Sequence, residues 1–332
     1  MKRIVLKTPM RYAINSFLLI AFMIMGYMIT QSGVLTRAQN NIIIQVGFFI
    51  ILAVSLNLTA GYLGQLPLGH AGFMAVGAYA GAIFWRAGVL PGYGSVIGGL
   101  LVAGLVAAVF GIIIGIPALR LRGDYLAIIT LGFGEIIRVI IMNIPSVTGG
   151  AQGLQQIPRH SSFLVVYTCV IICCLVIHMI MKSRHGRAIL SIRDNEIASE
   201  SCGINTTYYK VMAFAVSAFF AGVAGALYAG NLGILVPGDF SFMMSIEILM
   251  IVVLGGMGSM LGSIIGAIVL TSLPLLMQDL SQYRIIVFAL LLIIVMIFKP
   301  SGLMGNYDFS MGNSLEKIGN WVMNRKRKGG DV

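Results

Sequence analysis

The stretch YGSVIGGLLVAGLVAAVFGIIIGIPA, Tyr93 to Ala118, decides the fold class of this chain, because it holds no Asp, Glu, Lys, Arg or His. A run of about 20 apolar residues can cross the hydrocarbon core of a bilayer as a helix. The sequence therefore predicts an all-α polytopic membrane helical bundle of about ten transmembrane or re-entrant segments. Such apolar runs lie at about 12–33, 40–60, 67–87, 93–118, 125–143, 162–181, 208–230, 244–256, 260–277 and 283–298.

The composition agrees with this class, since 58% of the 332 residues are hydrophobic, 10% are charged and 41 are Gly. The run at 67–87 is rich in Gly and Ala and the run at 244–256 is short, so either can be re-entrant or broken. The first run is too long for a cleaved signal peptide, and we expect it to be retained. We predict one transmembrane domain, 1–305, followed by a basic cytoplasmic tail, 306–332, that meets anionic lipid heads.

The net charge of +11 indicates membrane sidedness and not a nucleic-acid surface, because the basic residues are not clustered on a soluble fold. Ten crossings place 17 of the 22 Lys and Arg on the side of both termini. The other five are Arg37, Arg86, Arg138, Arg159 and Arg284. Short loops rich in Lys and Arg stay in the cytoplasm, so both termini are predicted to be cytoplasmic.

Small residues recur every four positions within the predicted spans, which places them on one helical face. Such rows let helix backbones approach closely, which matters in lipid because the hydrophobic effect does not drive helices together there. We predict helix packing at these positions. The residues are Gly69, Gly77, Gly81, Gly258, Gly262 and Gly266.

The chain lacks the motifs of several chemistries. No G-x-x-x-x-G-K-[ST] loop occurs, so no phosphate-binding loop of that type is present and no cofactor is expected in the chain itself. Cys169, Cys173, Cys174 and Cys202 lack a convergent set of His or Cys partners, so they are predicted to be free thiols and no metal site is expected. No nucleophile–base set that would indicate a membrane enzyme is visible.

Ionisable residues inside membrane spans are functional candidates by default, and three of them are candidates for a translocation path. Glu135 and Arg138 are three residues apart and can pair on one helix face, so a structural pair and a role in translocation both stay open. His70 lies in a Gly-rich stretch that leaves room for a substrate, and for it too both interpretations stay open.

The polar loop 183–207 lies between two apolar runs, and we predict that it forms an amphipathic helix on the cytoplasmic side. Ile189, Ile192, Ile197 and Ile204 form an apolar stripe at near-helical spacing, and Gly203 is predicted to end the helix in a left-handed conformation. Its mixed charge favours a protein groove over a lipid surface. The residues predicted to make this contact are Arg187, Arg193, Asp194, Glu196, Ala198, Glu200 and Gly203.

The loop RDNEIASESCGI resembles a degenerate form of the EAA-type loop of bacterial ABC importer permeases, although the second Ala of that pattern is weak. Six other blocks occur in the order seen in one branch of these permeases. They are NLTAGYLGQLPLGHAGFMAVGAYAGA, LRGDYLAIITLGFGEIIRVI, TGGAQGL, AGVAGALYA, LGGMGSMLGSIIGA and FKPSGLMG. Together, over about 57–305, they resemble the LivM-type permeases of branched-chain amino acid importers.

This resemblance implies a multi-pass subunit of the bacterial cytoplasmic membrane that imports Leu, Ile and Val and is not itself an enzyme. It further implies a second, LivH-type permease, two ABC ATPase subunits that bind ATP, and an extracytoplasmic amino-acid-binding protein as partners. The nearest alternative is a related permease for urea, amides or another amino acid. A standalone ion-coupled carrier is an alternative of another class, and it would transport without ATPase partners.

Overall fold

The computed structural model describes residues 23–30, 32, 36–88, 90–121, 123–276, 290, 293, 297–298 and 302–303. Within these residues the regular structure is helical apart from one isolated bridge between Leu154 and Leu235, which confirms the predicted all-α class. The bundle belongs to one compact unit, 37–306, and the helical residues 23–30 belong to a different unit. The predicted tail 306–332 lies outside the described residues, as do most of the predicted segments at about 12–33 and 283–298.

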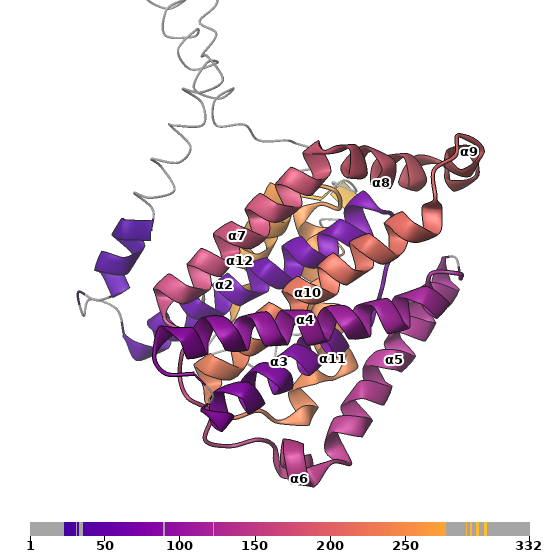
Figure 1. Ribbon diagram of the computed structural model, residues 1–332. Coiled ribbons are helices and arrows are strands. Elements are labelled where there is room, and N and C mark those ends of the chain that lie inside the picture. Colours follow the sequence, from indigo (N-terminus) through magenta and orange to yellow (C-terminus); the bar gives the residue numbers. More distant parts are fainter. Residues whose placement is uncertain are drawn as a thin grey trace, which may run out of the picture. The chain divides into compact units, whose positions relative to one another are not determined.

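Eight of the ten predicted segments coincide with long helices in the described residues (Figure 1). Five of the helices are long and apolar enough to cross a membrane, namely α2 together with the π-helical turn η1, α4, α5, α7 and α10. The long helices are α2 (Arg37–Asn57), α3 (His70–Ala87), α4 (Tyr93–Ala118), α5 (Asp124–Met142), α7 (Phe163–Lys182), α10 (Thr206–Leu232), α11 (Phe242–Gly255) and α12 (Met260–Leu276). The short elements are η1 (Leu58–Tyr62), α6 (Pro145–Thr148), η2 (Gly150–Gln152), α8 (Arg184–Asp194), α9 (Glu196–Ser201) and η3 (Pro237–Phe240).

The centre of the bundle is formed by α2, α3 and α10. Of the most apolar stretch of α2 with η1, 78% is buried, and of that of α10, 67% is buried. The same stretches of α4, α7 and α5 are only 33%, 33% and 22% buried. These outer helices are apolar on their exposed sides as well, which is the pattern of helices that meet lipid or another membrane subunit.

Glycines set the distance between the central helices. A Cβ at Gly77 of α3 would collide with the backbone of Gly222 in α10, and a Cβ at Gly81 would lie 2.8 Å from the Cβ of Ala226. Gly222 in turn faces α4, where its Cβ would lie 2.5 Å from the backbone oxygen of Ala103. Since small residues let backbones touch in this way, α3, α4 and α10 form one closely packed stack.

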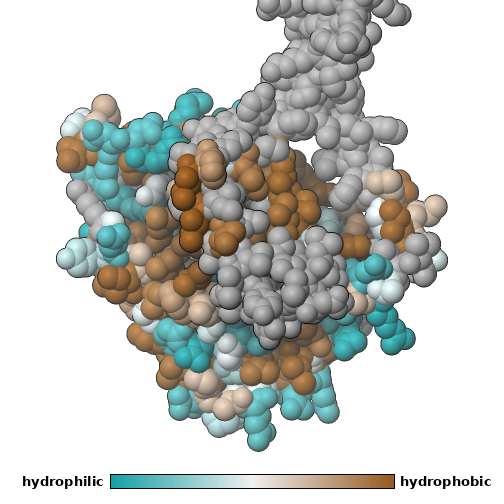
Figure 2. Space-filling view, turned by 180° about the vertical axis from the view of Figure 1, so that it is seen from behind, coloured by the Kyte–Doolittle hydropathy of each residue, from teal (hydrophilic) through white to brown (hydrophobic). Residues whose placement is uncertain are grey.

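The connecting segments gather at the two ends of the bundle (Figure 1). At one end lie α8 and α9, near η1. At the other end lie α6 and η2 and the bridge in which the N–H groups of Leu154 and Leu235 each donate to the other's carbonyl over 2.9 Å. Figure 2 shows hydrophilic residues toward the upper and lower ends of the visible face, with hydrophobic residues between them. This distribution is that of a protein that spans a membrane.

Candidate functional site: the α8–α9 loop and its contacts in the bundle

The polar loop forms two helices, α8 and α9, and not the single helix that the apolar spacing predicted. Asn195 between them is extended, with φ −159° and ψ 107°, and its side-chain Oδ1 accepts from the N–H of Ala198 over 3.0 Å. Asparagine is a favoured N-cap because its side chain replaces a missing backbone acceptor. The cap at Asn195 therefore starts a new helix in a different direction.

The break at Asn195 also divides the predicted apolar stripe. Ile189 and Ile192 on α8 are buried, whereas Ile197 on α9 is 66% exposed and Ile204 is half-buried. The prediction of one continuous apolar face was wrong, because a change in helix direction moves the later residues off the line of the earlier ones. The α8 part packs against the bundle, and the α9 part presents an apolar side chain outward.

Most of the charged residues of the loop have partners within this chain. Lys210 Nζ of α10 donates to Glu196 Oε1 over 2.8 Å, and the two side chains are 4% and 22% exposed. Thr206 Oγ1 donates to Glu200 Oε1 over 2.7 Å, and Arg193 pairs with Asp194 over 3.0 Å. Glu196, which the sequence analysis places in the contact with a partner, thus has its carboxylate directed at Lys210 of the same chain.

Gly203 ends α9 in the left-handed conformation that the sequence predicted, with φ +82°. The N–H of Gly203 donates to the carbonyl of Glu200 over 2.9 Å and that of Ile204 to the carbonyl of Ser199 over 3.1 Å. This pattern satisfies free carbonyls at a helix end. The exposed residues of α9 and of this helix end form one surface, which we call the α9 tip. It consists of Ile197, Ala198, Ser201, Cys202 and Gly203.

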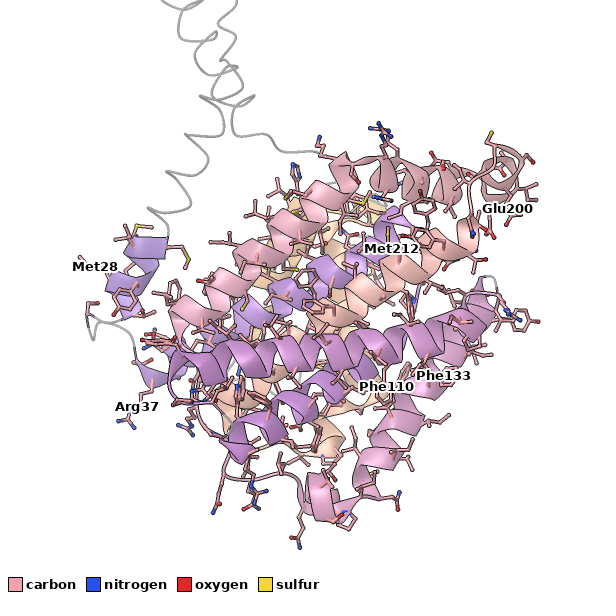
Figure 3. All side chains as sticks on the ribbon, in the orientation of Figure 1. Met28, Arg37, Phe110, Phe133, Glu200 and Met212 are labelled. Atoms are coloured by element: carbon pink, nitrogen blue, oxygen red, sulfur yellow. The ribbon has the colours of Figure 1, made fainter. Side chains whose placement is uncertain are left out.

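The α9 tip lies at the end of the bundle where Figure 3 labels Glu200. Its chemistry is apolar or small and uncharged, and α9 is attached to α10 by the Glu196–Lys210 pair. On α8, Arg187 is exposed. Figure 3 labels Arg37, the first residue of α2, at the other end of the bundle.

Arg193 extends from α8 to the end of α2. Its Nη1 lies 3.5 Å from the carbonyl oxygen of Gly61 in η1, and its Cγ would lie 2.8 Å from a Cβ at Gly64. Gly64 has φ +76°, so this position disfavours a side chain for two reasons. Arg193 therefore connects the loop to the segment at which α2 ends.

The Glu135–Arg138 ion pair predicted from spacing is present. Arg138 Nη2 lies 2.6 Å from Glu135 Oε2, and the side chains are 27% and 32% exposed. The other carboxylate oxygen of Glu135 accepts from the N–H of Phe242 over 3.1 Å. The pair therefore also satisfies the first backbone donor of α11, and a negative charge at a helix N-terminus is stabilising.

His70 is only 2% exposed and lies in a buried hydrogen-bonded cluster. Its Nε2 is 3.0 Å from Ser55 Oγ of α2, while Ser217 of α10 donates to the Ser55 carbonyl over 2.7 Å. The next residue, Ala71, donates its N–H to Ser245 Oγ of α11 over 3.2 Å. The cluster links four helices, and the roles of His70, Glu135 and Arg138 in translocation stay predictions.

The glycines predicted to pack helices lie in close contacts, with one correction. A Cβ at Gly69 would collide with the Thr130 carbonyl, one at Gly262 with that of Gly255, and one at Gly266 would lie 2.5 Å from the oxygen of Ile251. Gly258 lies in the turn before α12, with φ +84°, and not on the helical face of Gly262 and Gly266. The helix does not continue through a residue in the left-handed conformation, so spacing by four residues does not place Gly258 on the same face as Gly262 and Gly266.

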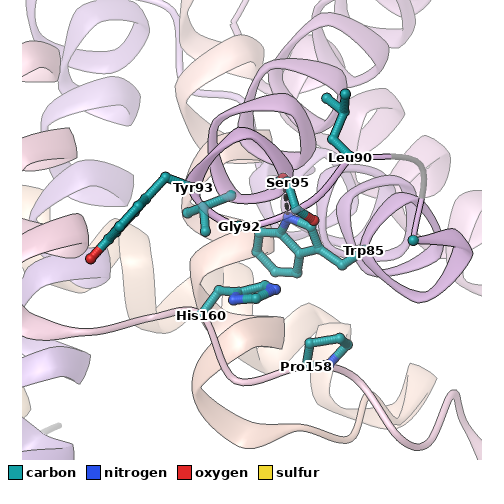
Figure 4. A pocket seen from close by; sticks show the side chains of 9 residues that line it. Trp85, Leu90, Gly92, Tyr93, Ser95, Pro158 and His160 are labelled. Atoms are coloured by element: carbon teal, nitrogen blue, oxygen red, sulfur yellow. Dashed lines mark hydrogen bonds between the residues drawn. The ribbon is translucent and has the colours of Figure 1, made fainter.

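A cavity of about 450 Å³ opens on the surface of the described bundle and is lined by Trp85, Leu90, Tyr93, Ser95 and His160 among others (Figure 4). The indole N–H of Trp85 donates to the Ser95 carbonyl over 2.9 Å, and its ring meets that of His160 edge-on at 5.4 Å.

A second cavity, of about 750 Å³, lies between α4 and the start of α10, and Ile112, Tyr208 and Met212 are among its residues. The four cysteines are free. Among the described residues, no three His, Cys, Asp or Glu side chains are grouped so that they could hold a metal ion.

Comparison with known proteins identifies the family. Residues 39–299 match the sequence model of the family described as branched-chain amino acid transport system / permease component. The chain belongs to this family. It is 36% identical to the high-affinity branched-chain amino acid transport system permease protein LivM of Salmonella typhimurium, over 81% of this chain and 70% of the relative.

Two further relatives are informative. The LivM protein of Escherichia coli is 37% identical over 77% of this chain and 67% of its own length. The LivH protein of Escherichia coli, also a high-affinity branched-chain amino acid transport system permease, is 24% identical over 77% of this chain and 91% of its own length. No solved structure matches. The chain is thus a multi-pass transport permease that is similar to both LivM and LivH.

The sequence did not predict three features of this permease, namely the buried contacts of Asn57, those of Lys210, and the cavity beside Trp85. Asn57 is 1% exposed and bonds to residues about 200 positions later in the chain. A signal was available for the first two, because an amide or ammonium group near an end of an apolar run must find a partner once it is buried. No spacing rule indicates which partner it finds.

Proposed function

We propose that this chain is a membrane-spanning permease subunit of a binding-protein-dependent ABC importer for the branched-chain amino acids Leu, Ile and Val. The observation that carries the ABC mechanism is the α9 tip, an exposed apolar surface on a short helix attached to α10. Membership of the permease family and the similarity to LivM and LivH support the substrate class.

The proposed partners are a second, LivH-type permease, two ABC ATPase subunits and an extracytoplasmic amino-acid-binding protein. ATP is bound and hydrolysed in the ATPase subunits, and this chain carries out no covalent chemistry. Ile197 and Ala198 suit an apolar groove in an ATPase, because a helix that docks in a groove uses its exposed apolar side chains. The acids Glu196 and Glu200 serve instead to hold α9 to α10.

For the substrate path, Glu135 and Arg138 are better candidates than His70. Their side chains are about one third exposed, on a helix of which only 22% of the apolar stretch is buried. The side chain of His70 is buried and contacts Ser55 of α2, so it has the role of a packing residue. A path beside α5 would lie on the surface of this chain, where a second permease can complete it.

The proposed location is the bacterial cytoplasmic membrane, with both termini and the α8–α9 loop in the cytoplasm. The described basic residues support this orientation. The α8–α9 end of the bundle is rich in basic residues, as cytoplasmic segments are. The residues at this end include Lys182, Arg184, Arg187, Arg193 and Lys210.

The test is purification of the chain from its native membrane, followed by reconstitution in proteoliposomes. We expect two ATPase polypeptides and a second permease to copurify, and uptake of labelled Leu, Ile and Val to require ATP and the binding protein. Uptake of urea or an amide in place of these amino acids would overturn the substrate class. Transport by the purified chain alone under an ion gradient would overturn the ABC mechanism.

A variant of the α9 tip tests the proposed contact with the ATPase subunits. Ile197→Asp places a charge in the α9 tip and is expected to release the ATPase subunits while the chain still reaches the membrane. Gln152→Asp, an exposed position at the opposite end of the bundle, is the matched control and should keep them bound. Retention of the ATPases by Ile197→Asp would remove the α9 tip from the interface.

A further inference from the structure

The turn between α11 and α12, residues 256–259, is held by partners from other parts of the chain. α11 has 14 residues, and at about 1.5 Å per residue it is about 21 Å long, which is shorter than the hydrocarbon core of about 30 Å. Irregular backbone next to such a short helix is stable in a membrane protein where its N–H and C=O groups find partners inside the protein.

Asn57, the last residue of α2, provides two of these partners. Its Oδ1 accepts from the N–H of Gly258 over 2.8 Å, and its Nδ2 donates to the carbonyl of Ser259 over 3.0 Å. A carboxamide carries an acceptor and a donor on two neighbouring atoms, whereas an ionised carboxylate of the same size has acceptors only. The amide is 1% exposed, so water does not replace it.

The backbones around the turn are in direct contact, because the meeting points are glycines. A Cβ at Gly61 in η1 would collide with the N atom of Gly258, and a Cβ at Gly302 would collide with Gly256. The N–H of Leu303 donates to the carbonyl of Leu254 over 2.8 Å. With no side chain between them to absorb a displacement, η1 cannot move toward the turn without displacing it.

The end of α2 is in turn connected to the α8–α9 loop. α2 continues into η1 as a π-helix, a rare form that is often found at functional sites. Arg193 of α8 contacts η1 at the Gly61 carbonyl and covers Gly64. The contacts therefore run without a gap from α8 through Arg193 and η1 to Asn57 and the turn.

We propose that Asn57 is a positioning residue of transport: it locks the α11–α12 turn to η1, and the loop displaces this lock through Arg193 when the ATPases act. The proposal rests on the proposed ATP-driven function. It assigns to the buried amide a role in coupling, since the turn can follow η1 only while both hydrogen bonds hold.

The test measures the number of amino acids imported per ATP hydrolysed in the reconstituted complex. Asn57→Asp has the same shape and keeps the acceptor for Gly258 but puts an oxygen against the Ser259 carbonyl. Asn57→Leu loses both hydrogen bonds. We expect this ratio to fall about tenfold in Asn57→Leu, the order expected when two hydrogen bonds no longer link the moving parts. A similar fall is expected in Asn57→Asp, where one bond is lost and two oxygen atoms repel each other, while hydrolysis stimulated by the binding protein continues in both variants.

Thr59→Val is the matched control. Thr59 is equally buried, but its hydroxyl bonds only within its own helix, to the Leu56 carbonyl over 2.9 Å. This variant should keep the wild-type ratio. A variant that merely lowered the amount of folded protein would reduce import and hydrolysis together and leave their ratio unchanged, and that result for both Asn57 variants would overturn the proposal.

Arg193→Gln gives a second line of evidence. If Arg193 and Asn57 act in one series of contacts, Asn57→Asp combined with Arg193→Gln should lower the ratio no further than the stronger single variant does. Multiplied effects in the double variant would show that the two residues act separately and would overturn the series. Loss of ATP-dependent import in the wild-type complex itself would instead contradict the proposed function.

Discussion

The Glu196–Lys210 pair predicts an asymmetric response to mutation. Glu196→Gln leaves the Lys210 ammonium, whose side chain is 4% exposed, without its carboxylate. An unpaired charge at such a site costs about 3–5 kcal/mol of folding free energy. Lys210→Met leaves the Glu196 carboxylate, which at 22% exposure can still be partly hydrated, and we expect a smaller loss of about 1–3 kcal/mol.

The double variant Glu196→Gln with Lys210→Met separates the pair from the environment. Both charges are then absent, and most of the stability lost in the single variants should return, since a neutral pair of similar volume replaces a buried ion pair with little net cost. The measurement is the denaturant or thermal unfolding of the purified chain in detergent, compared across the four proteins. Equal and additive losses for the two single variants would refute the reasoning, because they would mean that the side chains do not depend on each other.

Charge reversal distinguishes this interpretation from a contact between Glu196 and a partner. Glu196→Lys places two ammonium groups together and should detach α9 from α10, so that ATP-driven uptake is lost. Adding Lys210→Glu restores an opposite pair and should restore a substantial part of the uptake. If Glu196 instead faced a basic groove of an ATPase, the second change would bring no recovery.

Three further predictions concern other parts of the chain. Gly77→Leu should lose about 1–3 kcal/mol or fail to assemble because its Cβ meets the Gly222 backbone. Gly94→Leu, whose Cβ would lie 3.9 Å from its nearest neighbour, should be tolerated, and equal yields and transport for both variants would contradict the close packing at Gly77. Gly203→Val should lower uptake because a β-branched residue is strained at φ +82°, whereas Gly203→Asn should retain uptake. Equal uptake in the two variants would show that the left-handed conformation at Gly203 is not needed for transport. A membrane-impermeant thiol reagent should reach Cys202 only from the cytoplasmic side and Gln152→Cys only from the outside, and labelling of both from one side would contradict the topology.

The helical segments were predictable because each depends on a local property. The apolar run 93–118 coincides with α4, Tyr93–Ala118, since an uncharged stretch of this length can satisfy its backbone in lipid only as a helix. The Glu135–Arg138 pair was also predictable, because a spacing of three residues along a helix brings two side chains onto one face. These features need no knowledge of the rest of the chain.

The contacts that define the loop were not predictable in the same way. The partner of Glu196 is 14 residues away across a change of direction, and that of Asn57 is about 200 residues away. The break at Asn195 depends on a competition between continuing α8 and capping α9, and the apolar spacing of Ile189, Ile192 and Ile197 favoured the wrong outcome. Propensity alone does not decide such a competition, because the tertiary contacts of Lys210 contribute to it.

The break at Asn195 gives the loop two separate attachments. α9 is held to α10 by Glu196 and by Glu200 with Thr206, while α8 reaches η1 through Arg193. Inside the bundle α10 and α2 are joined again, since Ser217 donates to the carbonyl of Ser55, the second residue before Asn57. A force on the α9 tip therefore acts on α10 directly, and it reaches η1 by two routes, through Asn195 with Arg193 and through α10 itself. The backbone at Asn195 decides how far α8 moves with α9, and so how much of the force reaches the turn at 256–259 by the first route.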